Sequence, residues 1–583
     1  MRTFEDLLDA YARGKRELQT TVSIARHLAA ARLAITSSDG SRYTALHFFN
    51  EAFAQNSTLK EIYRREYVEA LTVGPYVRGD GVTEADLRAA FRSPIVRSRD
   101  LVAYAGDFIK DSDAGAALAE LRSAPNMTKE AMRPLLRRLS ESKVFLTTLD
   151  TVPISDWDLE ADLTTLRRCL LGVANEASLA HDRDAIHVAA ALATQCFLNE
   201  YVLEERPEEA EQIRILIDII AHDLSTNRKP SRLALAVSAA YRRLRATLPA
   251  LSAADLAGAG FERLARLHIS DPAEEARLMQ AIRTLTPITD PTSGAVRSQY
   301  EENPFPTWTA ARTAGPRRPA RERIAASLAS LAPESLSLPE DCSILVAGCG
   351  TGQQSVEMAS EFRTSRMLAI DLSRRSLAYA KRKAIELRLS SIEFAQADLL
   401  ELSGFQERFD IITSVGVLHH TRSMSEGWRV LRQLLKPRGV MQIGLYSGIA
   451  RRRIVEAREL IASSRIEPSN EAVRKFRQTL RTLRPDLHQD FSSLADFHTL
   501  NQCRDLLFHR HETTHDLPEI GALLTEMKLD LLGFNVDAAA ATQYRARFPD
   551  DPRMVSIENW HCFELDNPDT FRSMYHLWAV ARD

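Results

Sequence analysis

Three glycines at alternate positions, Gly348, Gly350 and Gly352, follow a short apolar run in this chain of 583 residues. Glycine has no Cβ, so a chain with this spacing can turn sharply and let a ligand approach its main-chain atoms. Two carboxylates, Asp371 and Asp398, come shortly after two further apolar runs that are typical of buried strands. A carboxylate at the end of such a strand can accept both hydroxyls of a ribose. Together these residues predict a nucleotide-type cradle.

Side chains that can move a proton lie near the same apolar runs. His419 and His420 follow the run 409–415, and an imidazole at that place could remove a proton from a ligand. We expect one of the two histidines to face the site and the other to be structural. Tyr446, at the end of a later apolar run, and Tyr300, upstream of the glycines, are secondary catalytic candidates.

A second imidazole candidate lies further along the chain. Asp505 and His509 are four residues apart, so a helix would place them on one face. Such a pair could orient the imidazole as a base or form only a structural hydrogen bond, and both alternatives stay open. The spacing of His509, His511 and His515 lacks a matching second group of ligands, so we expect no metal site.

Short apolar runs and helical patterns alternate through this part of the chain, which predicts an open, largely parallel sheet with helices packed against it. Ligands bind such a sheet at the carboxyl ends of the strands, where the glycines, carboxylates and histidines all fall. The expected strands are residues 344–346, 366–371, 392–395, 409–415, 440–446, 529–534 and 574–581, and helices are expected at 353–362, 373–388 and 424–435.

This series of residues resembles the class I S-adenosylmethionine-dependent methyltransferases. The segment from Tyr300 to Trp308 resembles one in bacterial methyltransferases that have a helical, tetratricopeptide-like N-terminal region. The resemblance implies an α/β Rossmann-like domain of seven strands, the last antiparallel beside the fifth, and S-adenosyl-L-methionine as the cofactor. The donor-binding residues that it implies are Gly348, Gly350 and Gly352 for the methionine portion, Asp371 for the ribose, Asp398 with Leu399 for the adenine, and Leu372 and Val415 beside them.

The glycine triplet departs from two related patterns. Ala347 stands where these methyltransferases often have Asp or Glu, so the ammonium of the methionine portion needs another acceptor. A dinucleotide-binding fingerprint is the alternative for the triplet. That fingerprint places its last two glycines three residues apart, and here Gly350 and Gly352 are two apart.

Helical patterns without competing strand patterns fill the chain to about residue 290 and predict a large all-α N-terminal region. A helical insertion of about eighty residues is expected before the sixth strand, as a candidate cap over the acceptor site. We divide the chain into 1–150 and 151–290 (helical region), 291–340 (linker with a rigid Pro/aromatic strap), 341–447 (Rossmann-like core), 448–525 (helical insertion) and 526–583 (last strands of the core).

The strap predicted for Tyr300 to Trp308 contains Pro304 and Pro306, which favour an extended segment over a helix. Its aromatic side chains could fill a groove between domains or form a lid over the methyl donor, and both could hold. In the insertion, the arginine-rich stretch 451–484 has acids interspersed at helical spacing. It predicts a solvated helix face, with recognition of an acidic peptide as the alternative.

The composition argues against nucleic acid and membrane partners, because a net charge of −3 gives no overall attraction to polyanions. Residues 1–20 lack the apolar core of a secretory signal, and the six cysteines show no CxxC spacing. We therefore expect a cytoplasmic protein, and a homo-oligomer is compatible with the sequence.

The expected function is in-line methyl transfer to an unidentified acceptor. A protein or peptide recruited by the helical region is slightly favoured as the acceptor, because that region is large for closing over a metabolite. A small-molecule methyltransferase and a non-catalytic scaffold that only binds the donor remain the alternatives.

Overall fold

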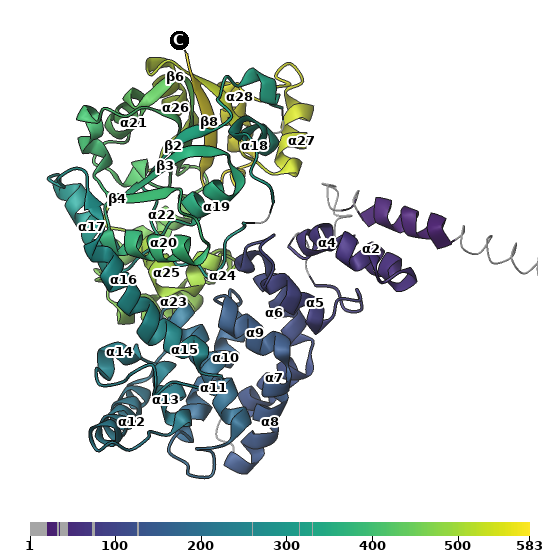
Figure 1. The fold of residues 1–583 in the computed structure, drawn as a ribbon, viewed down its shortest axis with the longest axis vertical. Helices are drawn as coiled ribbons and strands as arrows, with labels where there is room; N and C mark the ends of the chain where they lie inside the picture. Colours follow the sequence, from purple (N-terminus) through teal and green to yellow (C-terminus); the bar gives the residue numbers. More distant parts are fainter. Residues whose placement is uncertain are drawn as a thin grey trace, which may run out of the picture.

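The computed structural model describes residues 20–31, 34, 45–72, 76–124, 128–258, 260–313, 315–328 and 330–582. Helices of the N-terminal region occupy the lower part of Figure 1, and the sheet with its covering helices occupies the upper part. The expectation that the first 20 residues carry no secretory signal falls almost entirely outside the described residues. No helix among the described residues is long and apolar enough to cross a membrane.

One sheet of eight strands forms the upper part, in the order β1-β4-β3-β2-β5-β6-β8-β7. Pairing is parallel from β1 to β6, and β8 runs antiparallel to both of its neighbours, as predicted for the last strand. The strands are β1 (Arg283–Thr284), β2 (Cys342–Ala347), β3 (Thr364–Asp371), β4 (Ile392–Gln396), β5 (Phe409–Val415), β6 (Leu435–Leu445), β7 (Leu529–Phe534) and β8 (Tyr575–Ala581).

The eighth strand corrects the predicted count of seven. β1 is two residues long and ends a stretch with an apolar helical pattern, so its sequence carries no strand signal of its own. It forms because it pairs with the edge strand β4, where Arg283 lies opposite Ala395. The last residues of the helical region are thereby attached to the sheet.

Helices cover both faces of the sheet. β2 is buried along nearly its whole length, which explains its unbroken apolar run. The helices and 3₁₀ turns of this part are α17 (Pro291–Glu302), α18 (Ala320–Ser327), η4 (Pro333–Ser335), α19 (Gln353–Glu361), α20 (Arg374–Glu386), η5 (Leu399–Gly404), η6 (Leu418–His420), α21 (Met424–Gln433), α27 (Ala538–Arg547) and α28 (Ile557–Asp566).

Apart from β1, the regular elements of the N-terminal region are all helices among the described residues. Aspartates cap two of its longest helices: Asp156 accepts from the amide of Leu159, and Asp182 accepts from that of Ala185. The elements are α2 (Ala45–Gln55), α3 (Leu59–Ile62), α4 (Arg64–Ala70), α5 (Glu84–Phe91), η2 (Ser98–Leu101), α6 (Val102–Lys110), α7 (Asp113–Ser123), α8 (Lys129–Glu141), α9 (Lys143–Thr151), α10 (Trp157–Gly172), α11 (Arg183–Leu198), α12 (Pro207–Ser225), α13 (Arg232–Ala239), α14 (Leu244–Thr247), α15 (Glu262–Ala265), η3 (Arg266–Ser270) and α16 (Asp271–Gln280).

The insertion between β6 and β7 is helical and packs against the N-terminal helices. Its apolar side chains, Phe476 and Phe497 among them, belong to the same hydrophobic core as those of α10 and α11. Arg477 of the insertion and Glu160 of α10 form a buried ion pair of 2.7 Å. The elements are α22 (Arg452–Ser463), α23 (Asn470–Leu483), α24 (Pro485–Ser492), η7 (Ala495–His498), α25 (Leu500–Phe508) and α26 (Leu517–Glu526).

The predicted strap begins later than expected. Asp290 caps α17, Pro291 occupies its first turn, and the helix runs to Glu302, so Tyr300 lies on a helix and not on an extended segment. The non-helical segment that Pro304 and Pro306 favour therefore follows the helix, and Phe305 and Trp308 lie in it, outside regular structure. The division of the chain into six parts stays a prediction.

Candidate active site

A cavity of 690 Å³ lies at the carboxyl ends of the central strands. Seven of the eight predicted donor-binding residues line it, and so do three of the four catalytic candidates. These lining residues are Gly348, Gly350, Asp371, Leu372, Asp398, Leu399 and Val415, together with Tyr300, His420 and Tyr446. Gly352 and His419 are not among the lining residues.

The three glycines have positive φ angles of 77°, 52° and 82°, which other residues adopt at a cost. Close neighbours add a second reason for glycine. A Cβ on Gly350 would lie 2.8 Å from the carbonyl oxygen of Phe305, and one on Gly352 would lie 2.5 Å from Ala380 Cβ. Gly352 thus permits the close packing of α19 against α20, while Gly350 permits the strap to lie against the glycine loop.

Asp371 is fixed by two main-chain amides at the end of β3. Its Oδ2 accepts from Gly350 N at 2.8 Å, and its Oδ1 accepts from Ser373 N at 2.9 Å. Burial raises the pKa of Asp371 to about 6. The two carboxylate oxygens retain free lone pairs at the cavity, as a ribose site requires.

Burial raises the pKa of the Asp398 carboxyl, and the nearby Ser293 side chain opposes this shift only in part. Asp398 Oδ1 accepts from Leu400 N at 3.0 Å, whereas its Oδ2 is buried and has no hydrogen-bond partner among the described residues. The main chain of Asp398 is held by Thr286, whose hydroxyl accepts from Asp398 N at 2.8 Å. A buried carboxylate oxygen without a partner is costly, and an exocyclic amine of a ligand would satisfy it.

Tyr300 joins Asp505 and His509, and both Tyr300 and Asp505 line the cavity. Its hydroxyl donates to Asp505 Oδ1 at 2.9 Å and lies 3.2 Å from His509 Nε2. His509 Nδ1 accepts from His511 N at 3.1 Å, so in the neutral ring the proton is on Nε2 and points to the Tyr300 hydroxyl. Asp505 Oδ1 and His509 Nε2 are 3.7 Å apart, which is too long for a direct hydrogen bond.

His420 stacks on His509, with ring centroids 3.9 Å apart. Its Nδ1 donates to the carbonyl oxygen of His511 at 2.9 Å, which leaves Nε2 as the nitrogen with a free lone pair. Burial lowers the pKa of His420 to about 3, so the ring is neutral near pH 7. His420 therefore offers a hydrogen-bond acceptor to the cavity.

His419 lies behind this layer. It is fully buried, and neither ring nitrogen has a hydrogen-bond partner in the described part of the chain. Its ring stacks on Tyr446 at 3.8 Å, and the guanidinium of Arg451 lies 3.4 Å from the Tyr446 ring centroid. Within the described ranges, no group of three or more His, Cys, Asp or Glu residues could hold a metal ion.

The strap is fastened to the glycine loop. Trp308 Nε1 donates to the carbonyl oxygen of Thr351 at 2.9 Å, and the hydroxyl of Thr351 donates to the carbonyl oxygen of Pro306. Phe305 and Pro306 line the cavity, and the Phe305 ring stacks on Tyr300. These contacts support both the groove-filling and the lid interpretation.

The helical region contributes residues that the sequence did not reveal. Arg97 and Arg99 of the segment around η2 line the cavity, and Arg97 Nε donates to Glu357 of α19 at 2.7 Å. Val296 of α17 also lines it. A separation of 260 residues between Arg97 and Glu357 leaves no local pattern that could have predicted this contact.

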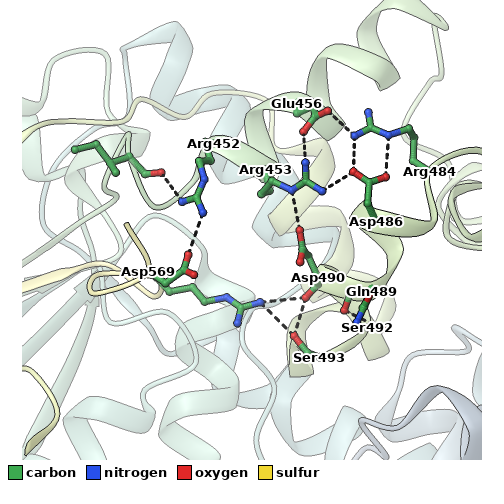
Figure 2. Close-up of polar contacts among 12 residues, drawn as sticks. Arg452, Arg453, Glu456, Arg484, Asp486, Gln489, Asp490, Ser492, Ser493 and Asp569 are labelled. Carbon is green, nitrogen blue, oxygen red and sulfur yellow. Dashed lines mark hydrogen bonds and ion pairs between the residues drawn. The ribbon is translucent and has the colours of Figure 1, made fainter. Parts of the chain in front are cut away.

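The arginine-rich stretch of the insertion is paired within the protein. Figure 2 shows Arg453 between Glu456, Asp486 and Asp490, and Arg484 bound to two of the same carboxylates. Arg452 reaches Asp569 at 3.4 Å. These arginines are therefore largely neutralised by internal ion pairs, which favours the solvated helix face over a site for an acidic peptide.

Residues 344–439 match a protein family described as a methyltransferase domain. The putative methyltransferase YqeM of Bacillus subtilis is 31% identical over 115 residues, which are 19% of this chain and 45% of that protein. The trans-aconitate 2-methyltransferase of Deinococcus radiodurans is 33% identical over 128 residues, 21% of this chain and 44% of that protein. The chain thus spans less than half the length of these relatives.

Among solved structures, PKMT2 from Rickettsia typhi aligns with a TM-score of 0.36 at 15% identity, over 46% of this chain and 56% of that chain. Its complex with AdoHcy aligns with a TM-score of 0.33 at 17% identity, over the same shares of the two chains. At these scores the likeness adds nothing to the family match.

The match identifies residues 344–439 as a methyltransferase domain, and the glycine loop and the order of the strands agree with the expected class I S-adenosylmethionine-dependent fold. The cofactor of this domain is S-adenosyl-L-methionine. The site fits this cofactor, because Asp371 can accept from ribose hydroxyls and the unsatisfied Asp398 Oδ2 can accept from the adenine amine. The dinucleotide-binding alternative is therefore not retained.

Proposed function

We propose that this protein transfers a methyl group from S-adenosyl-L-methionine to an acceptor that enters the 690 Å³ cavity. The observation that carries the proposal is the placement of two sets of residues on one cavity. Asp371 and Asp398 can hold a nucleoside, and the Tyr300, Asp505 and His420 side chains line the same cavity. A scaffold that only binds the donor would not need the second set.

When bound, the cofactor supplies a methyl group on a cationic sulfur, which is a good leaving group. The protein then has to align the acceptor and exclude water. Phe305 and Tyr300 close one side of the cavity, and His420 Nε2 accepts a hydrogen bond from the acceptor. A His420 pKa of about 3 makes this imidazole a weak base. We therefore assign His420 the role of positioning the acceptor and not that of removing its proton.

The acceptor class follows from how the cavity is built. The favoured acceptor is a protein or peptide recruited by the helical region, supported by the presence of Arg97 and Arg99 on the cavity wall. A small-molecule acceptor is the second candidate, because the core, the helical region and the insertion all contribute to one cavity of modest size. A peptide acceptor would have to insert its side chain between the core, the helical region and the insertion.

The experiment that separates the two classes is incubation of the protein with labelled S-adenosyl-L-methionine and fractionated lysate. Label that follows macromolecules supports the protein or peptide acceptor. Label found only in small molecules rejects it in favour of the second candidate. A matched incubation with Asp371→Ala gives the background, since this variant lacks the ribose acceptors.

A further inference from the structure

A second, smaller cavity of 190 Å³ lies beside the first. It is enclosed by the N-terminal helices, the strap, α20 and the start of α25, and Arg99, Pro306, Gln353 and Asp496 line both cavities. The volume is below that of a site for a whole drug-sized ligand. It suits one functional group of a ligand whose remainder lies elsewhere.

Basic side chains dominate the wall of this second cavity. Seven lysine and arginine residues line it, against four carboxylates. Two of the carboxylates are already paired: Asp271 with Arg266 at 3.1 Å, and Glu275 with Arg382 at 2.9 Å. Glu386, which does not line the cavity, also pairs with Arg266, Arg382 and Lys383. The positive charge that remains is therefore mainly that of Arg243, Arg263 and Arg375.

Glu200 contributes only part of a negative charge to this wall near neutral pH. It accepts from the amide of Asn501 at 2.6 Å and from its side chain at 2.9 Å, and burial raises the pKa of Glu200 to about 7. Burial also raises the pKa of Asp496. The shift of the Glu200 pKa reduces the negative charge that could neutralise the arginines.

Two of the lining arginines, Arg243 and Arg263, form no ion pair with a carboxylate among the described residues. Arg263 Nε is buried without any hydrogen-bond partner, and Arg243 contacts the Phe197 ring with its guanidinium 4.8 Å from the centroid. The nearest carboxylate to Arg99 is Asp100 at 3.9 Å. Burial lowers the pKa values of Arg263 and Arg99, and the carboxylates that act on them, such as Asp271 at Arg263 and Asp100 at Arg99, offset only part of this effect.

We propose that this second cavity is a subsite for an anionic group, a carboxylate or a phosphate, of the methyl acceptor. Guanidinium groups bind both anions through paired N–H donors, and Arg263 and Arg243 have donors free for this purpose. The shared wall at Arg99 and Gln353 places an anion here next to the transfer cavity. This inference rests on the proposed methyltransferase function.

The test uses inorganic phosphate as the probe and the full-length chain. Calorimetric titration, with sodium chloride at matched ionic strength as the reference, should show saturable binding of phosphate. Arg263→Gln and Arg243→Gln should each weaken that binding roughly tenfold or more. Arg228→Gln is the matched control, because Arg228 is exposed and lines neither cavity. Two arginine variants are used so that poor folding of one does not decide the result.

Two further measurements separate the possible outcomes: inhibition of methyl transfer by phosphate, and affinity for S-adenosyl-L-methionine. Phosphate that also inhibits methyl transfer to the acceptor fraction supports an acceptor subsite. Phosphate that binds through Arg263 without affecting transfer overturns the acceptor assignment and indicates a free-anion site. Absence of arginine-dependent binding overturns the proposal altogether. Affinity for S-adenosyl-L-methionine, measured in the same samples, separates this failure from failure of the proposed function, which would instead abolish donor binding or transfer.

Discussion

The hydroxyl of Tyr300 donates to Asp505 at 2.9 Å, although 205 residues separate the two in the sequence. Tyr300 lies on α17 just after the helical region, and Asp505 lies on α25 of the insertion. The contact therefore joins two parts of the chain across the cavity. It also explains why Asp505 and His509, predicted as a possible hydrogen-bonded pair, are instead connected through a third side chain.

Tyr300→Phe should reduce the rate of methyl transfer roughly tenfold or more, because it removes the donor to Asp505 and the partner of His509 Nε2. Donor affinity should change less than the rate, since the hydroxyl contacts Asp505 and His509 and neither of the predicted donor-binding carboxylates. Single-turnover rates and donor calorimetry check both statements. Tyr544→Phe is the control, because Tyr544 also donates to a carboxylate, Asp551, far from the site. Equal loss in the two variants would argue against a special role for Tyr300.

Asp371→Ala should weaken binding of S-adenosyl-L-methionine by roughly tenfold or more, because two charge-assisted acceptors for the ribose are lost. Calorimetry of the full-length chain is the measurement. Asp530→Ala provides the comparison, because Asp530 is exposed and pairs only with Arg582 at the edge of the sheet. Undiminished donor affinity in Asp371→Ala would refute the assignment of the ribose site.

The same carboxylate predicts a pH dependence of donor binding. Burial raises the pKa of Asp371 to about 6, so its charged form, which the ribose hydroxyls favour, is fully present only above that pH. Donor affinity should therefore fall as the pH is lowered through about 6. Asp371→Asn cannot titrate and should flatten this part of the profile. A wild-type profile that is already flat between pH 5 and 7, to be measured by calorimetry in steps of roughly half a unit, would contradict the prediction.

Gly350→Ala should weaken donor binding and lower thermal stability. The new Cβ would lie 2.8 Å from the Phe305 carbonyl oxygen, and the residue would hold a φ of 52°, so the strap or the glycine loop has to move. We expect a cost of about 1 to 3 kcal/mol in unfolding free energy. Gly404→Ala is matched, since nothing lies within 4 Å of its added Cβ. Equal donor affinities and equal melting temperatures of the two variants would contradict a tight contact between the glycine loop and the strap.

Trp308→Phe tests whether the strap acts as a lid. The variant keeps an aromatic ring but loses the bond from Nε1 to the Thr351 carbonyl oxygen, which costs about 1 kcal/mol, or roughly a fivefold change in an equilibrium constant. A lid should transmit this cost to donor affinity. Trp560→Phe loses a similar bond of 2.9 Å to the Met554 carbonyl oxygen in the core and should affect stability alone. Donor affinity unchanged in Trp308→Phe would reject the lid and leave a groove-filling strap.

The sequence predicted what local pattern determines. Alternating apolar runs located β2 to β8, and glycine spacing with Asp371 and Asp398 located most of the donor end of the cavity. Contacts made only in the folded chain were missed. β1 forms by pairing with β4, Tyr300 lies on a helix because Asp290 caps it, and Arg97 reaches Glu357 across 260 residues.

These contacts also bear on a fragment that starts near Gly294, close to the predicted boundary at residue 291. That start lies inside α17. The fragment would lack Thr286, which holds the main chain of Asp398, and also Arg97 and Arg99 of the cavity wall. Donor binding should consequently be weakened in such a fragment, and intact chains with point substitutions are the sharper test.

The most direct measurement of the central claim is transfer of label from S-adenosyl-L-methionine to lysate components, compared between the wild-type chain and Asp371→Ala at equal concentrations. Methyl transfer through this cavity predicts incorporation by the wild type that falls to near background in the variant, since Asp371 is fixed at the donor end by Gly350 and Ser373. Donor binding by the wild type with no incorporation above the variant's level would contradict the account and indicate a scaffold that binds the donor without using it.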